Sequence, residues 1–281
     1  MKESTDIGIG TILSGRYELV GELARGAMGT VYEASDRVEG GKAAVKVLDA
    51  QYLADDAMRR RFRREGAALK ALDHPAIVRL LELGVGDDGM VYLVTELVEG
   101  QTLAERLSAG PLRLEEADAL VTPLCGGVAA AHAHGILHGD IKPANVLWGD
   151  EAGRSPRLVD FSASKILGLD RLTATGEISG TPAYLAPEVL TGKADVDERI
   201  DVYGLGVLLY ESLSGNPPFE DRHVGRLMMK IDAGDCLPLD AVAHVPAQVS
   251  NVVACAMHRD KNARYRGAAE LEAAWREARK A

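Results

Sequence analysis

Cysteine, positive charge and long hydrophobic runs are all scarce in this sequence. The 281 residues include three cysteines, Cys125, Cys236 and Cys255, and no two of them have CxxC spacing. This pattern excludes a disulfide framework and gives no sign of a zinc site, so we expect a reducing, cytoplasmic compartment. No hydrophobic run approaches the length of a membrane span, and residues 1–6 lack the apolar core of a signal peptide. We therefore expect no membrane insertion by this chain.

The chain is acidic, with 32 Lys and Arg against 42 Asp and Glu and a formal net charge of −10. An acidic balance argues against nucleic acid or an anionic membrane as the main partner. Basic residues cluster only at residues 59–64, where arginines flank Phe62, and we interpret this cluster as a solvated helix face. The remaining composition, 47% hydrophobic and 26% charged, is typical of a globular protein that is long enough for two lobes.

Local patterns divide the chain into a strand-rich part and a helix-rich part. After a polar leader at residues 1–15, short alternating runs predict strands at 17–23, 30–35, 42–48, 77–83 and 90–97, with one predicted helix at 54–72. Helical patterns follow Gly100, at 102–109, 114–134, 187–190, 194–214, 224–233, 246–258 and 268–280. This order predicts an α+β fold, with a small antiparallel-sheet lobe over 16–98 and a larger, mainly helical lobe over 99–281.

A predicted hairpin carries the strongest chemical signal. Its two short apolar runs, 146–148 and 157–161, flank a polar connection. Pairing of these strands brings Asn145 and Asp160 to the same end of the hairpin, and Asp140 overhangs that end. Hard oxygen ligands of this kind suit a Mg²⁺ ion that shares its coordination shell with phosphate. Each residue alone is more often a turn or capping residue, but the spacing of all three, with a lysine between the first two, favours such a site.

Lys46 and Glu65 are predicted to form an ion pair. The predicted strand 42–48 is apolar on both faces, so the Lys46 ammonium group needs an anion. Glu65 falls on the apolar stripe of the predicted helix 54–72, where a carboxylate is costly without a cation. A glycine-rich turn at 24–29 lies upstream, and its small residues let backbone amides approach a phosphate, although such a turn alone is a weak signal.

Together these motifs resemble those of the eukaryotic-like (Hanks-type) serine/threonine protein kinases, in particular the bacterial ones. The resemblance extends from about Tyr17 to Arg266 and rests on motifs in a fixed order: 28–32 of the glycine loop, 44–46, Glu65, 74–78, 140–145, 160–161, 180–188, 201–207 and Arg264. It implies the bilobal protein kinase fold, a single kinase domain over 16–281, and ATP with Mg²⁺, or Mn²⁺ in its place. The implied reaction transfers the γ-phosphoryl group to Ser/Thr hydroxyls of proteins, including autophosphorylation.

The resemblance also implies a role for each matching residue. Asp140 takes or orients the proton of the substrate hydroxyl, Lys142 neutralises the transferring phosphoryl group, and Lys46 holds the α- and β-phosphates and pairs with Glu65. Asn145 and Asp160 bind the metal ion. Further nucleotide contacts are implied in the loop, the adenine pocket, the gatekeeper and the hinge, at Ala24, Gly26, Gly29, Val31, Ala44, Thr95, Glu96 and Val98.

Three further implied roles lie in the second lobe. Thr181 shapes the site for a Ser or Thr acceptor, and Thr173 and Thr175 form the Thr-Ala-Thr spacing of a phosphorylated activation segment. Glu188 and Arg264 resemble a buried structural ion pair, and Asp201 resembles the helix residue that braces the catalytic loop.

The sequence departs from the family pattern at three positions. Ala24 stands where the first loop glycine belongs, and Ser162 replaces the glycine after Asp160-Phe161. Gly139 replaces the arginine that receives the phosphate of a phosphorylated activation segment. None of the three is a metal ligand or the base, so we expect an active kinase with altered regulation.

Two alternatives remain open. The triplet at 138–140 is similar to the catalytic loop of aminoglycoside and choline phosphotransferases, which phosphorylate small molecules, although Lys142-Pro143 and the segment 180–188 favour a protein substrate. A pseudokinase scaffold is the second alternative, against which all five key polar residues are retained. The sequence leaves open the substrate, the upstream signal, the oligomeric state, and whether the chain is a soluble kinase or part of a longer protein.

Overall fold

The computed structural model describes residues 7–26, 28–86, 89–148, 156–161, 182–192 and 196–280. Its internal contacts divide the chain into two units, one of residues 1–73 with 78–99 and one of residues 74–77 with 100–281. We refer to them as the first and second unit. Within the described ranges, no helix combines the length and the apolar composition needed to cross a membrane.

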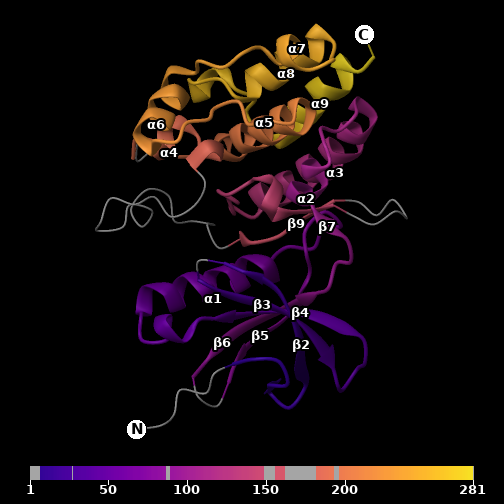
Figure 1. The fold of residues 1–281 in the computed structure, drawn as a ribbon, viewed down its shortest axis with the longest axis vertical. Coiled ribbons are helices and arrows are strands. Elements are labelled where there is room, and N and C mark those ends of the chain that lie inside the picture. The colour runs from indigo at the N-terminus through magenta and orange to yellow at the C-terminus, as the bar shows by residue number, and fades with distance from the viewer. Residues whose placement is uncertain are drawn as a thin grey trace. The chain divides into compact units, whose positions relative to one another are not determined.

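The first unit is an antiparallel sheet with one long helix. Its strands are β1 (Ile12–Leu13), β2 (Tyr17–Arg25), β3 (Gly29–Asp36), β4 (Lys42–Leu48), β5 (Leu80–Val85) and β6 (Val91–Glu96), in the spatial order β1-β2-β3-β4-β6-β5. The 3₁₀ turn η1 (Ala50–Tyr52) leads into the helix α1 (Asp56–Lys70), which lies against the sheet (Figure 1). The Asp55 side chain caps α1 by accepting hydrogen bonds from the amides of Ala57 and Met58, at 2.8 and 3.2 Å.

The two faces of this sheet have different neighbours. Alternate residues of β4, Ala43, Val45 and Val47, belong to a buried cluster together with Tyr17 and Tyr92. On the opposite face, Leu48, Val91 and Leu93 pack with Phe62 of α1. Because side chains alternate along a strand, Ala44 and Lys46 lie on the face that carries α1.

The second unit is mainly helical. Its small sheet has the order β7-β8-β9, formed by β7 (Gln101–Thr102), β8 (Val146–Trp148) and β9 (Arg157–Leu158). The helices are α2 (Leu103–Ser108), α3 (Leu114–Ala133), α4 (Pro187–Leu190), α5 (Arg199–Ser214), α6 (Val224–Ala233), α7 (Leu239–Val242), α8 (Ala247–Ala256) and α9 (Ala268–Ala278), with the 3₁₀ turns η2 (Pro143–Asn145), η4 (Pro182–Tyr184) and η5 (Lys261–Ala263). Helix α5 is buried on nearly every side, from Ile200 to Leu213, and α3, α8 and α9 contact it.

Most of the predicted elements are confirmed, and β4 and α6 have the predicted bounds. The start of the predicted strand 77–83 was wrong, because Ile77 forms a parallel bridge with Leu158 of the second unit and the strand begins at Leu80. The predicted strand 157–161 ends at Leu158, since Asp160 has a φ of 63°, which no strand residue adopts. Helix α5 begins at Arg199, later than predicted.

Candidate active site

Lys46 and Glu65 form the predicted ion pair within the first unit. The Lys46 Nζ donates to Oε1 and Oε2 of Glu65 at 2.8 and 2.9 Å. The Glu65 side chain is 3% exposed and that of Lys46 is 18% exposed. A carboxylate buried to this extent requires a cation, and the bidentate contact supplies it. The pair fixes α1 to β4 and holds the ammonium group in one place.

The predicted nucleotide-contact residues of the sheet share the face of Lys46. Val31 pairs with Lys46 across β3 and β4, and Ala44 pairs with Thr95 across β4 and β6. Directly opposite residues of antiparallel strands project to the same side, so these four side chains form one half-buried surface. A flat surface of small and branched side chains beside a fixed cation suits a nucleotide base and its phosphates.

The predicted glycine loop joins β2 and β3. Ala24 and Gly26 are exposed, and the Gly26 amide donates to the Gly29 carbonyl at 2.9 Å. A Cβ atom at Gly29 would lie 2.0 Å from the carbonyl oxygen of Val47, so only glycine fits beside β4. Gly29 therefore has a packing reason that is independent of any nucleotide.

The predicted hinge residues follow β6. The Glu96 carboxylate accepts a hydrogen bond from the Arg79 amide at 2.9 Å, and the Glu96 amide donates to the Arg79 carbonyl at 3.0 Å. Val98 is half-buried. These contacts anchor the end of β6 to the chain that enters β5.

In the second unit, two side chains converge on Asp140. The Lys142 ammonium and the Asn145 amide nitrogen both donate to Oδ2 of Asp140, at 2.8 and 3.0 Å, and the Asn145 nitrogen also donates to the Asp140 carbonyl at 2.8 Å. These contacts fix the carboxyl group and leave its Oδ1 oxygen as the acceptor for a substrate proton. They also leave the Asn145 side-chain oxygen as an acceptor, which is the atom that a hard cation binds.

The predicted hairpin holds Asn145 near Asp160. Val146 pairs with Leu158 and Leu147 with Arg157, and the Val159 amide donates to the Asn145 carbonyl at 3.0 Å. Asp160 adopts the left-handed backbone conformation, which aspartate tolerates better than most residues. An amide oxygen and a carboxylate at one end of a hairpin are the donor set that Mg²⁺ accepts when phosphate completes its shell, so these residues fit the implied ion.

Asp201 of α5 holds the catalytic loop from below, as predicted. Its carboxylate is 1% exposed and accepts the amides of His138 and Gly139 at 2.8 and 2.7 Å and Nε2 of His132 at 2.8 Å. Burial alone raises the pKa of Asp201, but the hydrogen bonds outweigh burial and lower that pKa below its usual value. Gly139 has a φ of 73°, a conformation in which a side chain would be strained.

The sequence reasoning missed two histidines that connect these parts. His132 of α3 donates to Asp201, and no sequence signal distinguishes it from other polar residues near a helix end. His138 contacts the Val159 carbonyl through Nε2 at 3.1 Å, and its ring lies 4.5 Å from that of Phe161. His138 therefore links the catalytic loop to the Asp160 segment.

The predicted ion pair of Glu188 and Arg264 is also confirmed. The Arg264 guanidinium donates to both Glu188 oxygens at 2.8 Å and to the carbonyls of His258, Arg199 and Arg259. All five N–H groups of this fully buried side chain thus have acceptors. Thr173, Thr175, Thr181 and Ser162 lie outside the described residues.

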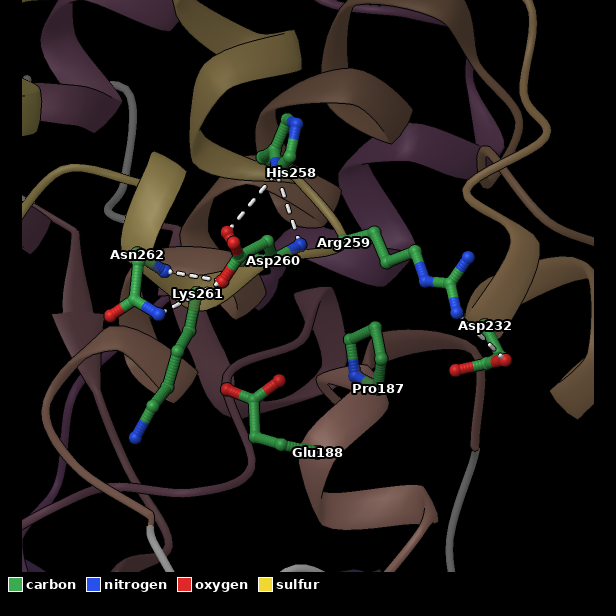
Figure 2. A pocket seen from close by; sticks show the side chains of 8 residues that line it. All are labelled: Pro187, Glu188, Asp232, His258, Arg259, Asp260, Lys261 and Asn262. Atoms are coloured by element: carbon green, nitrogen blue, oxygen red, sulfur yellow. Dashed lines mark hydrogen bonds and ion pairs between the residues drawn. The ribbon is translucent and has the colours of Figure 1, made fainter.

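A surface cavity of about 330 Å³ lies beside this ion pair (Figure 2). It is lined by Pro187, Glu188, Asp232, His258, Arg259, Asp260, Lys261 and Asn262. Figure 2 shows Arg259 extending toward Asp232, which it contacts at 3.5 Å, and Lys261 contacts Asp197 at 3.0 Å. Because these charges already have partners in the protein, we assign the cavity no part in phosphoryl transfer.

Comparison with known proteins identifies the family. The protein kinase domain family matches residues 17–275. The chain is 38% identical over 269 residues to serine/threonine-protein kinase PknL of Mycobacterium tuberculosis, covering 93% of this chain and 66% of PknL. It is 36% identical over 267 residues to serine/threonine-protein kinase PrkC of Bacillus subtilis, covering 94% of this chain and 41% of PrkC.

Solved structures agree. The crystal structure of the Mycobacterium tuberculosis PknI kinase domain matches with a TM-score of 0.77 and 29% identity, over 98% of this chain and 100% of that one. The chain therefore belongs to the protein kinase domain family, in its bacterial serine/threonine branch, and the predicted α+β kinase fold is confirmed. The family supports the predicted enzyme class, an ATP-dependent serine/threonine protein kinase. The chain spans less than two thirds of the length of these curated relatives.

Proposed function

We propose that this chain is an active kinase domain, over residues 16–281, that transfers the γ-phosphoryl group of ATP to serine and threonine hydroxyls of proteins, including its own. The observation that carries the proposal is the geometry around Asp140. Lys142 and Asn145 both bind Oδ2, which turns Oδ1 into a fixed acceptor at the tip of the loop. A pseudokinase would not need a carboxylate positioned in this way.

The roles of the residues follow from their contacts. Asp140 accepts the proton of the substrate hydroxyl through Oδ1 as the hydroxyl oxygen forms its bond to phosphorus and the bond to the β-phosphate oxygen breaks. Lys142, 2.8 Å from Asp140, places a positive charge where negative charge develops on the transferring group. Both residues work by position and charge, and neither forms a covalent intermediate.

The nucleotide is held by residues from both units. We propose that Lys46, fixed by Glu65, binds the α- and β-phosphates, and that Val31, Ala44 and Thr95 line the adenine pocket. Glu96 to Val98 supply backbone contacts, and Ala24, Gly26 and Gly29 cover the phosphates.

A metal ion and the acceptor have their own residues. Asn145 and Asp160 would hold Mg²⁺, which supplies charge neutralisation to the phosphate oxygens when bound. Thr181 is proposed to shape the acceptor site.

Regulation is proposed to be atypical. The amides of His138 and Gly139 are held by Asp201, which is part of the fold and needs no phosphate. Because Gly139 offers no guanidinium group, a phosphate on Thr173 or Thr175 has no reader at this position.

Incubation with Mg-ATP, followed by intact mass spectrometry of this chain and of a generic basic acceptor protein, tests the proposal. We expect mass steps of one phosphate on the wild type or on the acceptor. Asp140→Asn, which preserves the shape of the side chain, should add none while still binding ATP. A wild type that binds ATP but adds no phosphate to either protein would refute the proposal, and a nucleotide-consumption screen over metabolites would then separate a pseudokinase from a small-molecule phosphotransferase.

A further inference from the structure

Helix α1 carries a strongly basic outer face. Arg60, Arg63 and Arg64 are exposed, while Phe62 between them is fully buried. Residues three and four positions apart lie on the same side of a helix, so these three guanidinium groups share one face. We call Arg60, Arg63 and Arg64 the arginine face.

The arginine face differs from the other arginines of the chain in its lack of partners. Elsewhere, arginines are paired with carboxylates, as in Arg16–Asp36, Arg25–Glu22, Arg37–Glu18, Arg106–Glu116, Arg199–Asp197, Arg226–Asp221, Arg259–Asp232, Arg276–Glu272 and Arg279–Asp118. Even Arg59, next to the face, contacts Asp56. In the part of the chain that the structure describes, no carboxylate contacts any of the three arginines of the face.

This arrangement works against the stability of the helix. Arg60 and Arg64 are four residues apart, and like charges at that spacing repel each other and destabilise a helix. The chain has an excess of acidic residues, with a net charge of −10, and neutralises its other arginines. An external anion laid on the face would remove the repulsion, so the face is complementary to an acidic ligand.

The spacing indicates the form of that ligand. Arg60 and Arg64 are separated by about 6 Å along the helix axis. Alternate residues of an extended chain are separated by about 6.8 Å and project to the same side. Guanidinium groups form paired hydrogen bonds with carboxylates. An extended peptide with acidic residues at alternate positions therefore matches the face.

The opposite side of the same helix carries Glu65. It directly follows Arg64 in the sequence and binds Lys46 at 2.8 Å. Phe62 anchors this side of α1 in the cluster that contains Leu93. A ligand that steadies α1 from outside therefore also steadies the carboxylate that holds Lys46.

We propose that the arginine face binds an extended acidic segment of a partner protein, and that this binding raises kinase activity by stabilising α1 and its Lys46–Glu65 pair. The second part rests on the proposed function, whereas the binding does not. The segment is recognised by its carboxylates, so its affinity falls with salt. Raising the salt concentration from 0.1 M to 1 M shortens the Debye length from about 10 Å to about 3 Å and should weaken binding strongly.

Fluorescence anisotropy without nucleotide tests the binding. The probe is a labelled ten-residue peptide of alternating Glu and Ser, and its control is the same peptide with Gln in place of Glu. We expect the acidic probe to bind the whole chain and Arg60→Gln/Arg63→Gln/Arg64→Gln to weaken it by about tenfold, as the loss of a few exposed charge pairs implies. A matched variant, Arg113→Gln/Arg266→Gln/Arg276→Gln, removes three exposed charges from the second unit and should leave binding unchanged.

Several results would overturn the proposal. Equal binding of the Glu and Gln peptides, or equal weakening by the two triple variants, would show that the arginine face is not the site. Tighter binding of a single-stranded oligonucleotide at the same face would point to nucleic acid instead. Circular dichroism must show that both triple variants are folded, which is expected because the substituted side chains are exposed.

Activity provides the second readout. With the basic acceptor protein as substrate, the saturating Glu peptide should raise the rate of the wild type and of the matched variant by about threefold or more, which is under 1 kcal/mol of barrier, and should leave the arginine-face variant at its basal rate. Binding without any rise in rate would overturn the coupling to Lys46 and Glu65. If no variant transfers phosphate at all, the proposed function fails, and the anisotropy result still decides whether the face binds the acidic segment.

Discussion

The Lys46 ammonium of β4 lies within 2.9 Å of both carboxylate oxygens of Glu65 on α1. Neither residue is stable here alone, because the Glu65 carboxylate is buried and the Lys46 strand is apolar on both faces. The pair therefore has two consequences that can be separated, one for stability and one for phosphate binding.

A double-mutant cycle separates them. Lys46→Met should lower kcat/KM by about 100-fold or more, since it removes a fixed charge from the phosphates. It should also destabilise the fold by about 3 kcal/mol, because Glu65 loses the cation that compensates its burial. Adding Glu65→Gln should restore much of that stability and none of the activity. Urea unfolding and steady-state kinetics of the two single variants and the double variant make the measurement, and recovery of activity in the double variant would contradict the phosphate-binding role.

Asp160 is predicted to bind the metal ion. Asp160→Asn should weaken Mg-ATP binding by at least about tenfold, since loss of even an outer-shell partner of a metal site costs that much. Asparagine tolerates the left-handed backbone of this position, where φ is 63°, so the substitution changes charge and little else. Calorimetric titration with Mg-ATP and with ATP in EDTA makes the comparison. The EDTA affinities of the two proteins should agree, and unchanged Mg-ATP affinity would remove Asp160 from the metal site.

Thr173 and Thr175 are predicted to be dispensable for activity. Thr173→Ala/Thr175→Ala should lower the rate toward an external acceptor by less than about threefold, which corresponds to under 1 kcal/mol of barrier. The reason is that Gly139 carries no cation, while Asp201 holds the loop through backbone amides. Initial rates on the basic acceptor, with Asp140→Asn as the inactive control, give the answer. A loss of tenfold or more would mean that another basic group reads these phosphates.

Asp201 should make stability depend on pH. Its folded-state pKa is lower than the unfolded value of 3.8, so its carboxylate stabilises the fold above that pH and loses this effect as the pH falls through the folded-state pKa. Asp201→Asn should therefore lower the free energy of unfolding by about 2 kcal/mol at pH 7, the value of hydrogen bonds to a charged group. The difference from wild type should shrink below pH 3.8. Urea unfolding at pH 7, 5 and 3.5 measures it, and a difference that grows toward low pH would contradict the assignment.

Local patterns predicted most of the elements because those patterns are themselves local. The bounds of β4 follow from alternation between two apolar faces, and those of α6 from helical spacing that ends at Gly234 in a left-handed conformation. The pairing of Lys46 with Glu65 was also predictable, because an inward carboxylate and a strand lysine each require a counter-charge.

Other parts depended on contacts between distant segments. Ile77 continues an apolar run, yet it packs with Leu158 in the second unit and not in the sheet that the run predicted. His132 and Asp201 are separated by 69 positions, and no periodic pattern connects them. Asp160 adopts its left-handed backbone where the hairpin ends, which an alternating pattern does not anticipate.

The sequence alone therefore determined the family, the order of the elements and the identity of the polar groups at the site, because residue type and spacing specify these directly. The tertiary structure decided which atoms of those groups are engaged. It assigned both contacts of Lys142 and Asn145 to Oδ2 of Asp140, and it placed the Asp201 carboxylate beneath the loop. Those choices depend on the packing of α3 and α5 around the loop, and packing between distant segments leaves no periodic trace in a sequence.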